Sequence, residues 1–153
     1  MGFPYLPVAL PGPVYSLGGQ TTRHYPVLPA TVSTQAGVVL RDGLLDSGAA
    51  DTIFPVAVAQ KLGIDLRNAP TGQARQAGGG PLTYHFAAVT LRISDGQETC
   101  EWPAIVGFVA APMRWALLGQ TGFLQFFDVT LFGARRAVEL TPNATFPGRH
   151  TVH

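Results

Sequence analysis

The stretch GLLDSGAADTIFP, residues 43–55, places an ionisable carboxylate, that of Asp46, between apolar and very small residues. Leu44 and Leu45 precede it, and Ser-Gly-Ala-Ala follows it at 47–50. Asp, Ser and Gly are common in tight turns, because short polar side chains bond to nearby backbone and glycine tolerates unusual dihedrals. The other interpretation is a carboxylate held for chemistry, since small neighbours let backbone amides approach it closely. This stretch by itself leaves both interpretations open.

The composition indicates one globular domain and disfavours two classes of partner. A chain of 153 residues is long enough to bury a core, and 46% hydrophobic against 12% charged residues leaves apolar surface for an oligomer interface. The net charge of +1 favours neither nucleic acid nor an anionic membrane as a partner. The N-terminal stretch lacks the basic region of a signal peptide, and no window approaches the roughly 18 apolar residues of a membrane span. We therefore expect a cytoplasmic protein.

The cysteine and histidine residues predict neither a metal site nor a cofactor. Cys100 is the only cysteine, which excludes an intrachain disulfide, and we interpret it as a buried structural residue. His150 and His153 stand three apart near the C-terminal end, without a supporting carboxylate nearby, and are interpreted as part of a solvated tail.

The chain divides into three segments, of which the middle one is the domain. Residues 1–22 are rich in Pro and Gly, which excludes a helix or a central strand, and predict an extended arm that is either mobile or lies on a neighbouring subunit. Residues 23–141 carry the periodic patterns, and residues 142–153 form a polar tail that we expect to be frayed.

The middle segment predicts a mostly β, barrel-like or sandwich domain with one or two short helices. Pro26 and Pro29 favour an edge position for its first strand. Helices are expected at 55–64, beginning at Pro55, and at 120–127. Strands are expected at 24–33, 37–45, 52–54, 82–94, 99–109 and 114–119, with a hairpin at 128–140.

Three segments in order resemble the retropepsin-like aspartic proteases. VLRDGLLDSGAADTIFP (39–55) resembles their active-site segment, QARQAGGGPLTYHF (73–86) their glycine-tipped flap, and WALLGQTGFLQFFDVTL (115–131) their apolar-apolar-Gly element with its following helix and strand. The resemblance covers about residues 25–140 and implies a single-domain acid-protease β-barrel.

The resemblance also assigns roles to individual residues. It implies that Asp46 is catalytic and that Gly119 lies under the active-site loop. Support of that loop is assigned to Ser47, Gly48, Ala49, Thr52 and Gly119, with Ser47 bonding across a two-fold axis. Substrate binding is assigned to Gly48, Asp51, Ala77, Gly78, Gly79, Gly80 and Leu118.

Aspartic proteases need two carboxylates that share a proton, one acting as base toward water and the other as acid toward the scissile carbonyl. The chain contains one Asp-Ser-Gly and is too short for two lobes, so the second carboxylate must be Asp46 of another copy. We therefore expect a homodimeric aspartic endopeptidase that cleaves an extended peptide or protein substrate, without metal or cofactor.

Two positions depart from the retroviral pattern. Retroviral members usually carry an acid where this chain has Ala50 and an arginine where it has Gln120, and these two side chains form an ion pair. Loss of both partners leaves no unpaired charge, which points to a cellular or bacterial-type branch of the family. Asp51 follows one position later and is expected either to contact substrate backbone or to cap a turn.

Two alternatives remain open at this point. The chain is also compatible with a non-catalytic homodimer that uses the same fold to bind peptide or to assemble, because fold does not fix function. The sequence favours catalysis, since a binding module has no reason to keep an ionisable group between Leu45 and Ser47. It is also compatible with a domain of a longer protein whose proline-rich start is a linker.

Overall fold

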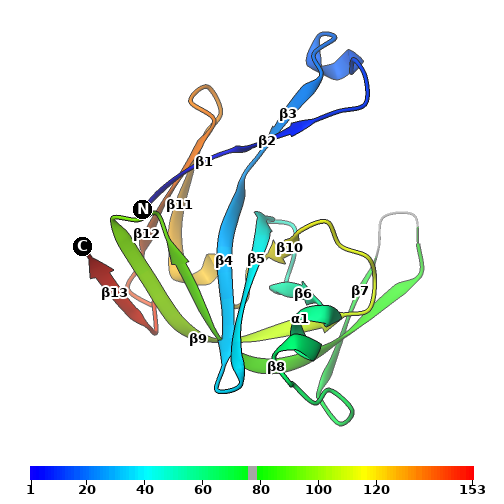
Figure 1. The fold of residues 1–153 in the computed structure, drawn as a ribbon, viewed down its shortest axis with the longest axis vertical. Helices are drawn as coiled ribbons and strands as arrows, with labels where there is room; N and C mark the ends of the chain where they lie inside the picture. The colour runs from blue at the N-terminus through cyan, green and yellow to red at the C-terminus, as the bar shows by residue number, and fades with distance from the viewer. Residues whose placement is uncertain (76–78) are drawn as a thin grey trace.

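The computed structural model describes residues 1–75 and 79–153 and is mostly β (Figure 1). Its one α-helix, α1, spans Val56–Lys61, and short 3₁₀ helices lie at Tyr15–Leu17 and Leu124–Phe126. The strands are β1 Gly2–Pro4, β2 Leu6–Ala9, β3 Thr22–Tyr25, β4 Val27–Thr34, β5 Gly37–Leu45, β6 Ile53–Pro55, β7 Thr71–Arg75, β8 Pro81–Ser94, β9 Glu98–Val109, β10 Ala116–Leu118, β11 Phe127–Phe132, β12 Ala137–Pro142 and β13 Arg149–Val152.

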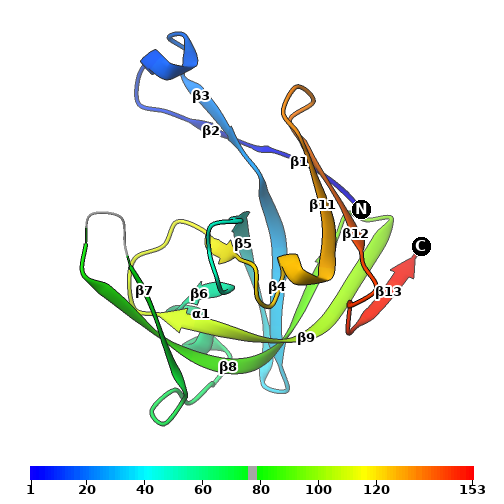
Figure 2. The same ribbon diagram turned by 180° about the vertical axis from the view of Figure 1, so that it is seen from behind.

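The largest sheet has the strand order β13-β9-β6-β10-β5-β4-β8-β7. Strand β8 also pairs with β9, from Tyr84 opposite Val109 to Ser94 opposite Thr99, and this pairing closes the sheet on itself. Figure 2 shows β8 and β9 running side by side across the lower part of the barrel. The barrel-like, mostly β domain predicted from the short alternating runs is therefore confirmed.

Alternation along the strands explains the core. In β8, Val89, Leu91 and Ile93 are buried while Arg92 between them is exposed, the period of two that points alternate side chains inward. The same period continues in the facing residues of β9, where Trp102 is almost completely buried. Cys100 is fully buried, as predicted, and burial raises the pKa of its thiol to about 11.

Two strands that are far apart in the sequence run in parallel and carry the site. Strand β10 pairs with β5, so that Leu118 lies beside Leu45 at the residue that precedes Asp46. Gly43 makes this approach possible, because a Cβ there would lie 2.6 Å from Cγ of Leu118. Strand β6 then pairs with β10 through Ile53 and Leu117, which brings both ends of the 46–52 loop to β10.

Helix α1 begins one residue after the predicted start and ends at Lys61, three residues before the predicted end. Pro55 forms its N-cap in an extended conformation, and Gly63, at φ +64°, follows its last turn in the left-handed region that favours glycine. The second expected helix, at 120–127, is wrong as an α-helix, because only a single 3₁₀ turn forms at Leu124–Phe126 before β11 begins.

The two proline-rich segments differ from expectation. Strand β4 is not an edge strand, because it pairs with β5 on one side and through Ala30–Ser33 with β8 on the other. Pro29 is tolerated because it lies just outside the stretch that pairs with β8. The N-terminal arm is extended but lies on its own chain, where β1 pairs with β12, and β2 and β3 form a separate hairpin that projects from the barrel (Figure 1).

The C-terminal tail is not frayed, because β13 pairs with β9 through four residue pairs. His150 lies 2.6 Å from Oε2 of Glu98, and His153 lies 3.0 Å from the hydroxyl of Thr99, so neither histidine is simply solvated. Polar side chains on an exposed edge strand concealed this pairing in the sequence. Within residues 1–75 and 79–153, no helix has the length and apolar character needed to cross a membrane.

Candidate active site

Asp46 begins a tight loop directly after β5. Its amide donates to the carbonyl of Leu118 at 3.1 Å, which ties the start of the loop to β10. Its Oδ1 accepts a hydrogen bond from the amide of Gly48 at 2.9 Å, and its carbonyl accepts one from Ala49 at 3.1 Å. The carboxylate therefore caps its own turn and, being only half-buried in a single chain, remains accessible to a ligand.

A second segment of backbone holds the rest of the loop. The amides of Gln120 and Thr121 donate to the carbonyls of Ala49 and Ala50, each at 2.9 Å. The amide of Thr52 donates in return to the carbonyl of Thr121 at 3.0 Å. Residues 49–52 and 119–121 thus form a small ladder whose geometry does not depend on solvent-exposed side chains.

Thr52 and Gly119 form the inner face of this ladder. The Thr52 hydroxyl is fully buried, donates to the carbonyl of Thr121 at 2.8 Å and accepts from the amide of Gly119 at 3.3 Å. A Cβ at Gly119 would overlap the carbonyl of Asp51 and lie 2.8 Å from that of Ala49. Only glycine fits at this point, because the obstacle is backbone, which has no alternative rotamer.

Gln120 stabilises the start of the loop. Its Nε2 donates to the carbonyl of Ser47 at 2.9 Å, so a neutral amide reaches the loop at the position where the retroviral pattern has an arginine. The departure at this position was visible in the sequence, but the contact with Ser47 was not. Ser47 itself is exposed. Its expected bond across a two-fold axis involves a second copy of the chain and stays a prediction.

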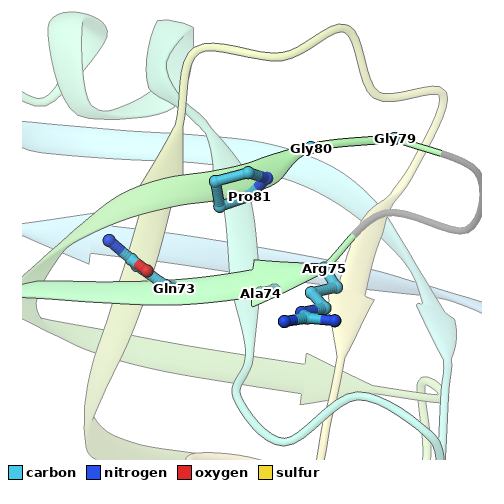
Figure 3. A pocket seen from close by; sticks show the side chains of 6 residues that line it. All are labelled: Gln73, Ala74, Arg75, Gly79, Gly80 and Pro81. Atoms are coloured by element: carbon cyan, nitrogen blue, oxygen red, sulfur yellow. The ribbon is translucent and has the colours of Figure 1, made fainter.

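A pocket of about 340 Å³ lies between this loop and the β7–β8 hairpin. Asp46 and Asp51 lie on its loop side, and Tyr84 of β8 lies on its hairpin side. The lining consists of Asp46, Gly48, Ala49, Ala50, Asp51, Ile53, Gln73, Ala74, Arg75, Tyr84 and Leu117. The three residues from β7 also line an adjoining hollow with Gly79, Gly80 and Pro81, which Figure 3 shows around the hairpin.

The two carboxylates of this pocket are held differently. Oδ2 of Asp51 accepts a hydrogen bond of 2.6 Å from the hydroxyl of Tyr84, whose ring is almost completely buried. Burial has the largest effect on the Tyr84 phenol. Together with the hydrogen bond to Asp51 and the negative charge of Asp51, it raises the pKa of Tyr84 to about 12. The phenol therefore stays protonated, and can donate to Asp51, below about pH 12.

The structure changes the list of expected site residues at Leu118. This side chain is fully buried in the core against Gly43, and Leu117 lines the pocket instead, because alternate residues of β10 face opposite sides. Gly79 and Gly80 adjoin the pocket, whereas Ala77 and Gly78 lie outside the described residues. Sequence reasoning missed Tyr84, which no motif marks.

Comparison with known proteins agrees with this geometry. Residues 28–120 match the family model described as aspartyl protease, and the chain belongs to this family. Its fold is similar to the retroviral protease-like domain of Ddi1 from Leishmania major, at 15% identity over 82% of this chain and 94% of that one, with a TM-score of 0.52. It is also similar to a retropepsin-like aspartic protease from Rickettsia conorii, at 20% identity over 92% of this chain and 91% of that one, with a TM-score of 0.51. A search of curated proteins finds no match. The fold is thus retropepsin-like, and the matched range contains the Asp46 loop and the β7–β8 hairpin.

Proposed function

We propose that this protein is an aspartic endopeptidase that forms its catalytic dyad from two copies of Asp46 across a homodimer. The observation that carries the proposal is the position of Asp46 at the start of a loop braced from below by Gly119 and Thr52, on the wall of a pocket. Membership of the aspartyl protease family supports the same chemistry.

The need for a second copy follows from the chemistry and from the sequence, because Asp51, the other carboxylate of the pocket, is bonded to Tyr84 and lies outside the Asp-Ser-Gly motif. Asp46 is the only residue of the chain in an Asp-Ser-Gly context, and its carboxylate is half-exposed in a single chain. Two carboxylates about 3 Å apart cannot both ionise, so they share one proton. The ionised one accepts a proton from the attacking water, and the protonated one donates to the carbonyl oxygen of the scissile bond.

The surrounding residues take supporting roles in this proposal. Ser47 bonds across the two-fold axis, and Gly48 presents backbone to an extended peptide. Asp51 contacts the substrate with the carboxylate oxygen that Tyr84 does not occupy. The β7–β8 hairpin, with its glycines at 78–80, acts as the flap over the peptide.

The decisive experiment is a cleavage assay of the purified protein against a mixed peptide pool between about pH 4 and pH 7. Wild type is compared with Asp46→Asn, and with Asp128→Asn as the matched control, because Asp128 is exposed on β11. We expect acid-leaning cleavage in the wild type and the control, its loss in Asp46→Asn, and its inhibition by an aspartic-protease inhibitor.

Two results would reject the proposal. Cleavage that survives Asp46→Asn shows that another group activates the water. An active enzyme that sediments only as a monomer shows that a single chain holds a complete site. A stable dimer of wild type that binds peptides but cleaves none favours the non-catalytic binding module instead.

A further inference from the structure

Tyr84 lies at the point where the β7–β8 hairpin leaves the barrel. It is the first residue of β8 that pairs with β9, opposite Val109, while Pro81–Thr83 pair with β7. The pairing of β7 with β8 extends from Thr71 opposite His85 to Arg75 opposite Pro81. Between the described residues of this hairpin and residues 46–52 there is no backbone hydrogen bond, and the Tyr84–Asp51 side-chain bond joins the two.

Two glycines hold the Tyr84 ring in one orientation. A Cβ at Gly72 of β7 would lie 2.6 Å from Cε2 of Tyr84, and a Cβ at Gly107 of β9 would lie 2.6 Å from its Cδ2. The ring of Phe86 packs edge-on against that of Tyr84, with the two ring centroids 5.2 Å apart and an interplanar angle of 86°. Gly72, Gly107 and Phe86 thus form a slot for the Tyr84 ring. Tyr84 as a residue is 4% exposed, so its hydroxyl has little freedom to turn elsewhere.

The partner of the hydroxyl is also fixed. Asp51 forms a parallel bridge with Thr121, which holds its backbone to the segment that braces the Asp46 loop. Its side chain bonds to Tyr84 at 2.6 Å. Among the ion pairs of residues 1–75 and 79–153, none involves Asp51, and the cation that shares its pocket is Arg75.

We propose that Tyr84 is a positioning residue that holds the Asp51 carboxylate against the substrate pocket, with Oδ2 on the hydroxyl and Oδ1 directed to a hydrogen-bond donor of the bound peptide. The ring slot built from Gly72, Gly107 and Phe86 makes this orientation permanent rather than induced by the ligand. This inference rests on the proposed function, because it gives Asp51 a peptide to contact.

The kinetic test compares Tyr84→Phe with wild type. Phenylalanine keeps the ring in its slot and removes only the hydroxyl, so we expect an unchanged fold and a rise in KM of about tenfold, with kcat changed by less than about twofold. Tyr15→Phe is the matched control, because Tyr15 is completely exposed on the β2–β3 hairpin, and should leave both constants unchanged. In an Asp51→Ala background, Tyr84→Phe should raise KM no further, since there is no carboxylate left to position.

A second measurement does not need activity. Titration of the Tyr84 phenol, followed by ¹³C NMR of its ring carbon Cζ, should give a pKa near 12 in wild type. Asp51→Asn should lower this pKa, because the hydrogen bond to a charged acceptor and the negative charge both disappear, while burial keeps it above the ordinary value of 10.

These results separate this inference from the proposed function. A Tyr84 pKa that Asp51→Asn leaves unchanged overturns the bond, and with it the positioning role, whatever the enzyme cleaves. Equal falls in kcat and kcat/KM for Tyr84→Phe also overturn the inference, because they indicate a role in the chemical step. A wild type that cleaves nothing while the pKa responds as expected rejects the proposed function and leaves the Tyr84–Asp51 pair without a peptide to position.

Discussion

The two walls of the pocket are built in different ways. The Asp46 loop is held by backbone, through amide–carbonyl bonds between residues 49–52 and 120–121, with the Thr52 hydroxyl beneath them. The β7–β8 hairpin has its own backbone ladder, but it packs against the pocket through side chains, in a small hydrophobic cluster separate from the main core. Its buried members are Ile53, Tyr84 and Val109, and Ala74, Leu82, Phe86, Ala111, Met113 and Leu117 pack around them.

This difference separates two kinds of requirement. Backbone bonds fix the loop that carries Asp46 and leave no space for extra atoms, so the loop should respond to any substitution beneath it with a loss of stability. Side-chain packing under the hairpin allows adjustment, because rings and aliphatic groups can shift by a few tenths of an ångström. Substitutions there should change substrate binding more than stability.

The largest effect is expected beneath the loop, for Gly119→Ala. Its Cβ would overlap backbone of Asp51, so the loop must move, and we expect the free energy of unfolding to fall by about 3 kcal/mol. Urea denaturation measures this change. Gly133→Ala is the control, because nothing lies within 4 Å of a Cβ there, and its effect should stay within about 0.5 kcal/mol. A tolerated Gly119→Ala would break the comparison, because it would mean that the loop adjusts as the hairpin does.

Thr52→Val should have the next largest effect. The side chain keeps its shape but loses the buried hydroxyl, which leaves the amide of Gly119 without its acceptor, at a cost of about 2 kcal/mol. The same denaturation experiment on Thr130→Val, an exposed position on β11, should show little change. Equal effects at the two positions would contradict the supporting role of the hydroxyl.

On the hairpin side, Gly72→Ala should cost only about 1 kcal/mol, because the clash is with the rings of Tyr84 and Phe86 rather than with backbone. The displaced Tyr84 should weaken substrate binding, so KM should rise by more than the loss of stability suggests. Gly37→Ala on β5, which meets nothing within 4 Å, is the control for both measurements. A stability loss as large as that of Gly119→Ala would remove the distinction between the two walls.

The smallest effect is expected for Gln120→Ala. It removes one exposed hydrogen bond to the Ser47 carbonyl, worth less than about 1 kcal/mol. Hydrogen exchange of the Gly48 amide should nevertheless accelerate, because the loop loses its side-chain brace. Gln20→Ala, exposed on the β2–β3 hairpin, should leave this exchange rate unchanged, and an unchanged rate in both variants would show that the backbone ladder suffices alone.

The sequence predicted the parts of this architecture that depend on local pattern. Alternation predicted the strands, Pro55 marked the start of helix α1, and the Asp-Ser-Gly motif located the loop. Errors arose where a distant partner decides the structure. Polar residues 149–152 pair with β9, and Pro29 lies in a strand that has neighbours on both sides for half its length.

The residues of the candidate site divide in the same way, into those that a local pattern marks and those that depend on distant partners. Gly119 and Thr52 could be assigned because the family pattern places them, and both lie under the loop. Tyr84 could not be assigned, because its role depends on Gly72 of β7 and Gly107 of β9, the two strands that pair with its own strand β8. Leu118 was placed on the wrong side of β10, because three residues are too few for alternation to reveal which face is buried.

The central claim is that one chain supplies half of a catalytic dyad, and mixing wild type with Asp46→Asn tests it most directly. The two proteins are unfolded, combined in equal amounts and refolded together, so that chains associate at random. If each active site needs Asp46 from both chains, activity at constant total protein should fall to about one quarter of the wild-type value, because only that fraction of dimers contains two intact chains. An activity of about one half would contradict the claim, because it is the value expected when every wild-type chain works alone.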